Sequence, residues 1–147
     1  MIKIIISEID GVITSGRSMI DNIGITLFKD FYIGDFEAIN KLKTDVQFVF
    51  LSSDNNVNYN MCARKCIPFF WAQKSKRDIL LDILRKYNYT LDETIYIGSL
   101  ISDVPCMNLV PNSFCTNPLL GFKGFKAAPG AGVLTELYLN RKEYLCL

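Results

Sequence analysis

Runs of aliphatic residues alternate along the chain with segments whose apolar residues recur every three or four positions. The continuous apolar runs cover residues 2–6, 46–51, 67–72 and 94–97, and the last of them ends at Gly98. A run of this kind is typical of a strand that is buried on both faces, as in the interior of a parallel sheet. The pattern therefore predicts four buried strands.

Helical spacing appears between these runs. Residues 35–43 and 75–87 carry apolar side chains three and four positions apart, which predicts two amphipathic helices. Ser75 followed by Asp78 is a typical signal for the start of the second helix. A last helix is expected at about residues 132–144, with one apolar face that docks on the sheet.

Strands that alternate with amphipathic helices pair in parallel through right-handed crossovers. The order of elements therefore predicts an α/β fold, a doubly wound parallel sheet in a three-layer sandwich, and one domain over residues 1–147. Ligands of such folds bind at the carboxyl ends of the strands. The polar stretches that follow the strands, residues 7–11, 52–56 and 98–99, would lie together at that edge.

Residues 17–31 interrupt this alternation. Asp21 to Gly24 form a turn signal between two short runs of mixed character, a pattern that predicts a β-hairpin. A hairpin that protrudes alone is short of buried surface, so it either folds over the strand ends or pairs with another subunit.

Composition narrows the range of functions. Half of the 147 residues are hydrophobic, and 16 basic residues against 15 acidic ones leave a net charge of +1, which disfavours nucleic acid and anionic membranes as partners. The chain has no histidine, and its five cysteines lack the paired spacing of a zinc site, which favours free thiols in a reducing compartment. The amino-terminal apolar run is too short for a membrane span, so we expect a soluble, cytoplasmic protein.

Four motifs follow the predicted strands in order: the stretch Glu8-Ile9-Asp10-Gly11-Val12-Ile13-Thr14, then Ser52, then Lys76, then the stretch from Tyr96 to Met107. These motifs resemble those of the haloacid dehalogenase-like superfamily, and within it the capless 3-deoxy-D-manno-octulosonate 8-phosphate phosphatase family. The resemblance covers nearly the whole chain and implies a Rossmann-type fold without a cap domain. The chain is also similar to the C-terminal domain of acylneuraminate cytidylyltransferases, which has lost the same first acid.

The resemblance implies a particular chemistry. In such phosphatases the first acid attacks phosphorus, and the second protonates the leaving oxygen and then activates water. A Ser or Thr hydroxyl and a lysine neutralise phosphoryl charge, and Mg²⁺ binds the first acid, the backbone of the second and a carboxylate of the fourth motif. The resemblance thus assigns catalytic roles to Glu8, Asp10, Ser52 and Lys76, and metal-binding roles to Glu8, Asp10, Ser99 and Asp103.

The chain departs from the family pattern at the chemistry itself. Glu8 stands where the family has the attacking aspartate, and its extra methylene adds about 1.5 Å of reach. A misplacement of roughly 1 Å can cost on the order of a hundredfold in rate. Ser99 and Leu100 replace an acidic pair, which removes a hard anionic ligand that Mg²⁺ requires. Asp103 remains and is expected either to serve the metal or to pair with Lys76.

The substrate side of the pattern has also lost its arginines. The family's Gly-Arg after the second strand is Ser53-Asp54 here, the arginine expected before Asp35 is Gly34, and Ala131 stands at the arginine position of the last glycine-rich loop. Without guanidinium groups, a phosphorylated sugar acid loses its bidentate partners.

These departures favour a degenerate member of the family, with weak or no phosphatase activity, weak or lost Mg²⁺ binding, and a role as an oligomeric scaffold or ligand-binding module. Capless members typically form tetramers through their hairpins, so the resemblance implies a homo-tetramer and a sugar phosphate as the ligand. The alternative is an active Mg²⁺-dependent phosphatase on a sugar-acid phosphate that uses Glu8 and Asp10, with Asp103 as metal ligand.

Two further interpretations stay open. A sensor could bind a sugar phosphate without hydrolysing it, and Asp10, Ser52, Lys76 and Asp103 could persist as a purely structural network of caps and salt bridges. A phosphorylation receiver domain also uses acids, a hydroxyl and a lysine at strand ends, but the hairpin and the fourth motif disfavour it.

Overall fold

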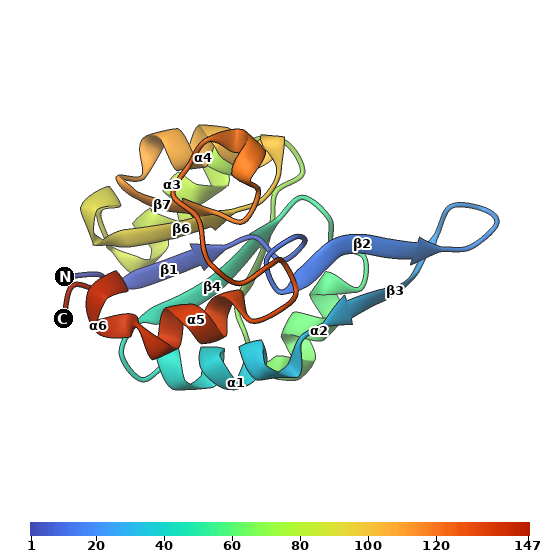
Figure 1. The fold of residues 1–147 in the computed structure, drawn as a ribbon. Helices are drawn as coiled ribbons and strands as arrows, with labels where there is room; N and C mark the ends of the chain where they lie inside the picture. The colour runs from blue at the N-terminus through green and yellow to red at the C-terminus, as the bar shows by residue number, and fades with distance from the viewer.

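The computed structural model describes all 147 residues and is built around a five-stranded parallel sheet (Figure 1). The order of its strands is β5-β4-β1-β6-β7, and their bounds are β1 (Ile4–Ser7), β4 (Gln47–Ser52), β5 (Phe69–Trp71), β6 (Thr94–Gly98) and β7 (Asn112–Cys115). The predicted α/β fold with a doubly wound parallel sheet is confirmed. All four predicted strands are present, although β5 is shorter than its apolar run, and β7 was not predicted.

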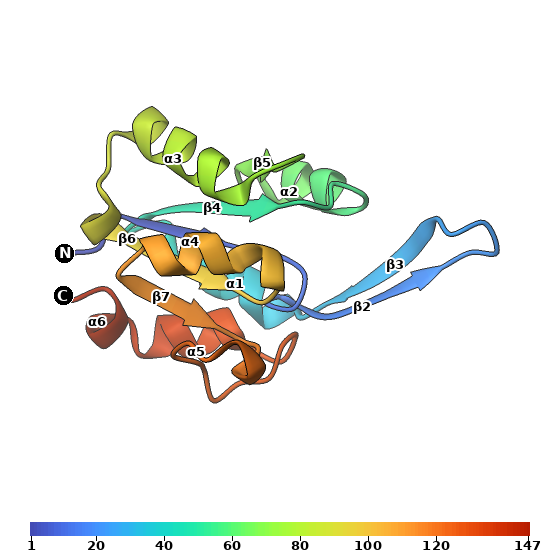
Figure 2. The same ribbon diagram turned by 90° about the horizontal axis from the view of Figure 1, so that it is seen from above.

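Helices cover both faces of the sheet and complete the three layers (Figures 1 and 2). One face packs against α1 (Ile33–Leu42) and α5 (Val133–Leu139), and the other against α3 (Lys76–Tyr87) and α4 (Val104–Leu109). Successive residues of a strand point to opposite faces, so Ile5 enters the first core while Ile4 and Ile6 enter the second. This explains why Ile4, Ile5 and Ile6 are all aliphatic.

The helix predictions agree at α3 and differ at the end of the chain. Ser75 accepts a hydrogen bond from the Asp78 backbone N–H at 3.2 Å, so the cap predicted there is present. The last helix is not continuous, because Asn140 leaves the helical conformation and separates α5 from α6 (Arg141–Tyr144). Two short helices, α2 (Asn58–Lys65) and α4, were not predicted.

Three single turns of 3-10 helix complete the chain: η1 (Leu91–Glu93), η2 (Ile101–Asp103) and η3 (Pro118–Leu120). The longest helix, α3, has 12 residues, and no helix combines the length and the apolar character that crossing a membrane requires.

The predicted hairpin is present as β2 (Thr14–Ile20) and β3 (Thr26–Phe31). Asp21 stabilises its turn, since one carboxylate oxygen accepts hydrogen bonds from the backbone of Ile23 and Ile25 at 2.9 Å each. The hairpin projects from the end of the molecule opposite to the two chain termini (Figures 1 and 2).

The carboxyl ends of the three central strands lie side by side next to the base of the hairpin. Strand β1 lies between β4 and β6, with Ser7 in register with Phe50 and Ile97. The turn after β1 contacts the loop after β6 closely, because a Cβ atom at Gly11 would lie 2.0 Å from the Ser99 hydroxyl oxygen. Gly11 also has a φ of +81°, which favours glycine. This edge of the sheet gathers the polar segments that the sequence places at strand ends.

Candidate functional site

A buried cluster of charged side chains lies at this edge, and we call Glu8, Lys76, Asp103 and Tyr96 the inner cluster. The Lys76 ammonium forms a salt bridge with a Glu8 carboxylate oxygen, and it lies 2.8 Å from Asp103 Oδ1. Both carboxylates are completely buried. Three elements meet here, since Glu8 follows β1, Lys76 begins α3 and Asp103 ends the turn after β6.

Asp103 is the most completely hydrogen-bonded member of the inner cluster. Its Oδ1 accepts the Tyr96 hydroxyl at 2.6 Å in addition to Lys76, and its Oδ2 accepts the backbone N–H groups of Ser99 and Leu100 at 2.9 and 2.8 Å. These four donors hold the carboxylate, and with it the loop after β6, in place.

Glu8 folds its side chain back onto its own loop. Its Oε1 accepts hydrogen bonds from the backbone N–H groups of Ile9 at 2.8 Å and Asp10 at 3.3 Å, while Oε2 faces Lys76. Both oxygens of the carboxylate therefore have partners within the protein.

The inner cluster holds two carboxylates and one ammonium group, so its charges do not balance when all are ionised. Burial raises the pKa of Glu8, and the attraction of Lys76 opposes this shift only in part. Burial alone would lower the pKa of Lys76, but the two carboxylates outweigh it, so the net shift is upward and the lysine stays charged. Burial, reinforced by Asp103, also raises the pKa of Tyr96 well above its usual range, which keeps its hydroxyl a donor.

A second lysine centre lies beside the first, and we call Lys29, Asp10, Asp54 and Asn58 the outer cluster. The Lys29 ammonium, from β3 of the hairpin, lies 3.0 Å from an Asp10 carboxylate oxygen, 2.8 Å from Asp54 Oδ2 and 3.2 Å from Asn58 Oδ1. The Lys29 side chain is fully buried, whereas those of Asp10 and Asp54 are 17% and 46% exposed. The outer cluster ties the hairpin to the loops after β1 and β4.

Asn58 completes this arrangement from the first turn of α2. Its Nδ2 donates to Asp10 Oδ2 at 3.0 Å and to the Asp54 backbone carbonyl at 2.9 Å. Asp10 is thus held by a lysine and an amide on the side away from Lys76.

The structure brings together some of the predicted site residues and separates others. Glu8, Lys76 and Asp103 meet, and the Ser52 hydroxyl is buried beside them. This hydroxyl opposes part of the upward shift in the pKa of Glu8, and it accepts the Asp54 backbone N–H at 3.2 Å. Asp10 belongs instead to the outer cluster. The pairing of Asp103 with Lys76, one of the two arrangements expected from the sequence, is present.

Lys29, Asn58 and Tyr96 were not predicted to be site residues, and Asp54 was noted only as a replacement for an arginine. One signal for Lys29 exists in the sequence. Strand alternation places Lys29 on the same hairpin face as Phe31, which packs against the core. Nothing comparable in the sequence points to Asn58.

The residues that the resemblance assigns to Mg²⁺ do not fit a metal site in this arrangement. Lys76 lies between Glu8 and Asp103, the Asp10 carboxylate is held by Lys29, and the Ser99 hydroxyl faces Gly11. The structure contains no group of three or more acidic or cysteine side chains able to hold a metal ion. A hard divalent cation takes several oxygen ligands, and here each of these carboxylates is already paired with a lysine.

The two positions at which the resemblance expects further arginines, Gly34 and Ala131, both lie near Tyr32. A Cβ atom at Gly34 would lie 2.7 Å from that ring, and Ala131 lines the same surface hollow as Tyr32. The aromatic ring thus takes up space next to Gly34 that a longer side chain would need.

Comparisons with known proteins agree with the fold. The chain is 30% identical over 116 residues to the 3-deoxy-D-manno-octulosonate 8-phosphate phosphatase of Haemophilus influenzae, and the match covers 77% of the chain and 64% of that enzyme's length. No family model matches the chain.

Solved structures extend the likeness over the whole chain. The cobalt-bound 3-deoxy-D-manno-octulosonate 8-phosphate phosphatase of Haemophilus influenzae superimposes with a TM-score of 0.87 at 25% identity, covering 99% of the chain and 90% of that structure. The corresponding enzyme of Moraxella catarrhalis, in complex with magnesium, phosphate and the sugar product, has a TM-score of 0.84 at 17% identity and covers 97% and 87%.

The parallel sheet, the hairpin after β1 and the acids and lysine at the strand ends define a haloacid dehalogenase-like protein. Within that superfamily, the chain is similar to 3-deoxy-D-manno-octulosonate 8-phosphate phosphatases, and it spans less than two thirds of the length of the curated enzyme that it matches.

Proposed function

We propose that the chain is a degenerate member of this phosphatase family, with weak or no phosphatase activity. The observation that carries the proposal is the engagement of Glu8, whose two carboxylate oxygens are bonded to Lys76 and to the backbone of Ile9 and Asp10. A nucleophile needs a free oxygen in line with phosphorus, and this carboxylate offers none without breaking buried contacts. Asp10, the expected proton donor, is held as a salt bridge by Lys29.

The proposal includes weak or lost binding of Mg²⁺. The two crystallised relatives bind cobalt and magnesium. In this chain Ser99 stands where the family pattern has an acid, and the remaining carboxylates form salt bridges with lysines. A hydroxyl is a poor substitute for a carboxylate as a magnesium ligand.

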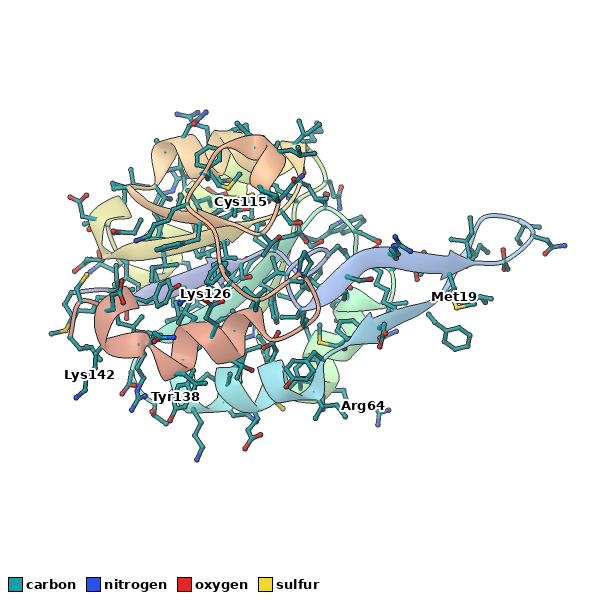
Figure 3. The ribbon with its side chains drawn as sticks, viewed as in Figure 1. Met19, Arg64, Cys115, Lys126, Tyr138 and Lys142 are labelled. Atoms are coloured by element: carbon teal, nitrogen blue, oxygen red, sulfur yellow. The ribbon has the colours of Figure 1, made fainter.

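The retained role that we propose is assembly. The two strands of the hairpin and the turn between them expose large apolar side chains, each 50% to 74% exposed: Met19, Ile20, Ile23, Ile25, Leu27 and Phe28. Figure 3 shows Met19 on the outer half of the hairpin, far from the sheet. Contiguous apolar surface of this kind typically marks an interaction site. We therefore propose a homo-tetramer formed through the hairpins.

Phosphate release tests the catalytic part of the proposal. We would compare the unaltered protein with a Glu8→Asp, Ser99→Asp double variant on 3-deoxy-D-manno-octulosonate 8-phosphate and a panel of sugar phosphates, with and without Mg²⁺. We expect release only by the double variant. Mg²⁺-dependent turnover by the unaltered protein, abolished by Glu8→Gln and by Asp10→Asn, would establish the active phosphatase instead.

Light scattering after size-exclusion chromatography tests the assembly. We expect a tetramer for the unaltered protein and smaller species for Phe28→Glu, because a charge in the apolar hairpin surface opposes its burial. Ser18→Glu, also exposed on the hairpin, is the control for charge alone. A monomer at all concentrations in the unaltered protein would refute the scaffold role.

A further inference from the structure

Several hydrogen-bond donors at the carboxyl end of β1 converge on a single anionic group. The Ile9 and Asp10 backbone N–H groups point at Glu8 Oε1, the Lys76 ammonium meets Oε2, and the Ser52 hydroxyl lies against the same carboxylate. We call these donors the cradle. Successive backbone N–H groups combined with an ammonium group and a hydroxyl are a typical binding site for a tetrahedral oxyanion.

The other backbone N–H groups of this loop are bonded elsewhere. Those of Val12 and Ile13 donate to the Ile9 carbonyl at 3.1 Å each, and that of Gly11 donates to the Thr14 hydroxyl at 3.2 Å. The Ile9 and Asp10 N–H groups are left for the cradle. The loop therefore directs two backbone donors at one point, where Glu8 Oε1 accepts both, and bonds its other N–H groups within itself.

We propose that Glu8 is a built-in anion that occupies an oxyanion site, so that the protein excludes the phosphate group which the cradle would otherwise bind. The proposal deepens the proposed function, because it names a physical reason for weak or absent activity. The ligand of the site would be phosphate or the phosphoryl group of an ester, and Glu8 would compete with it from within the protein.

The length of the glutamate side chain makes this possible. An aspartate at position 8 has one methylene fewer and is about 1.5 Å shorter, so its carboxylate would lie nearer the backbone and leave room between itself and the cradle. The glutamate can turn its carboxylate back to the next two N–H groups while it still meets Lys76. Glutamate in place of aspartate at position 8 thus has two effects: it changes the nucleophile and it fills the cradle.

Removing the Glu8 carboxylate should leave the protein folded. Lys76 keeps its partner Asp103 at 2.8 Å, so the buried charges then balance one to one. Truncation should therefore open the cradle without collapsing the edge of the sheet.

The experiment measures binding of inorganic phosphate by calorimetry to the unaltered protein, Glu8→Ala and Glu8→Gln, at constant ionic strength set with chloride. We expect Glu8→Ala to bind phosphate at least tenfold more tightly than the unaltered protein, a gain of about 1.4 kcal/mol. Glu8→Gln is the matched control, because its amide still fills the cradle and should bring no gain. Glu8→Ser is the second truncation if the alanine variant does not fold.

A Glu8→Ala, Lys76→Met double variant tests whether the new site is the cradle, and we expect it to lose the gained affinity. Equal phosphate affinity in the unaltered protein and Glu8→Ala, or no binding to either truncated variant, would overturn the proposal. These outcomes are separate from the test of function. Suppose that the Glu8→Asp, Ser99→Asp variant stays inactive while Glu8→Ala binds phosphate. The role of Glu8 as a built-in anion is then supported, and the expectation that these two reversions restore phosphatase activity is refuted.

Discussion

The inner and outer clusters each set one lysine between two carboxylates, yet they differ in burial and in origin. Lys76 lies among residues that are all buried, and every member of its cluster belongs to the sheet edge or to α3. Lys29 reaches in from the hairpin and neutralises Asp10 and Asp54, which remain partly exposed to solvent. The same arrangement, a lysine between two carboxylates, therefore occurs once in the interior of the protein and once near its surface.

This difference predicts unequal energetic consequences. A lysine that is the sole cation between two buried carboxylates cannot be removed without leaving uncompensated charge in a region of low dielectric. A lysine whose partners reach water leaves them solvated and screened when it is removed. We therefore expect the inner cluster to determine stability, and the outer cluster to determine where the hairpin lies.

The largest effect is expected for Lys76→Met. Glu8 and Asp103 would then face each other without a cation, and we expect a loss of about 3–5 kcal/mol in the free energy of unfolding. Urea denaturation at neutral pH measures it. In a Glu8→Gln, Lys76→Met double variant only Asp103 remains charged, so part of the loss should be recovered. A loss below about 1 kcal/mol in the single variant would contradict the role given to the inner cluster.

Tyr96→Phe sharpens the same point without changing any charge. Asp103 loses one of its four donors, the hydroxyl at 2.6 Å, and we expect a loss of about 2 kcal/mol in the free energy of unfolding. Tyr87→Phe is the control, since Tyr87 is only partly buried and lies outside both clusters. Equal urea midpoints for the two variants would show that the Tyr96 hydroxyl adds nothing to Asp103.

The sequence predicted the parts of the structure that depend on a long apolar pattern or on the position of a strand end. The aliphatic runs predicted four strands, and the rule that carboxyl ends meet at one edge placed residues 7–11 beside residues 52–56 and 98–99. The family resemblance added Lys76, which the structure places against Glu8. The short elements were not predicted. Helix α2 buries only Asn58 and Cys62, so it has no apolar stripe to detect, and β7 begins with two polar residues.

The outer cluster could not be predicted for a different reason. Its contacts join residues 19, 25 and 29 positions apart on a hairpin and two loops, and no periodicity fixes how a hairpin leans on loops. Only the alternation that pairs Lys29 with Phe31 indicated an inward face. The separation of Asp10 from Glu8, two residues apart in the chain, depends on this tertiary contact.

Asp35 provides a third case for the comparison, a buried carboxylate that has no lysine partner. Asp35 is fully buried, accepts the Thr135 backbone N–H and hydroxyl at 2.9 Å each through Oδ1, and leaves Oδ2 without a hydrogen-bond partner. It serves α5 as an N-cap, because that helix begins after Gly132, which has no side chain. Removing this cap in Asp35→Ala should cost about 1 kcal/mol.

Burial raises the pKa of Asp35 above its usual value of 3.8. The protonated carboxyl is favoured in the folded state, so this stabilisation is full below that value and is lost as the pH rises through the folded pKa. Asp35→Asn keeps an acceptor for Thr135 but cannot ionise. Urea midpoints at about pH 4 and about pH 7 should therefore show the asparagine variant gaining on the unaltered protein as pH rises. An unchanging difference between the two would contradict this.

The smallest effect on global stability, and the most local one, is expected for Lys29→Met. Asp10 and Asp54 remain partly solvated, so we expect a loss below about 1 kcal/mol in the free energy of unfolding. A two-stranded hairpin is only marginally stable alone, and Lys29 is its polar tie to the loops after β1 and β4. Hydrogen exchange in residues 26–31 should therefore accelerate while exchange in β1 and β6 stays slow.

Arg17→Met is the matched control, because Arg17 is the other cation of the hairpin and is exposed. Equal exchange in the two variants would mean that the apolar contacts of Phe31, rather than the Lys29 salt bridges, hold the hairpin against the body. Faster exchange in Lys29→Met alone would establish that the outer cluster holds the hairpin, whereas the inner cluster, of similar composition, determines stability. Because Lys29 also holds Asp10, the position of the hairpin would then determine whether the second acid of the ancestral pair is free.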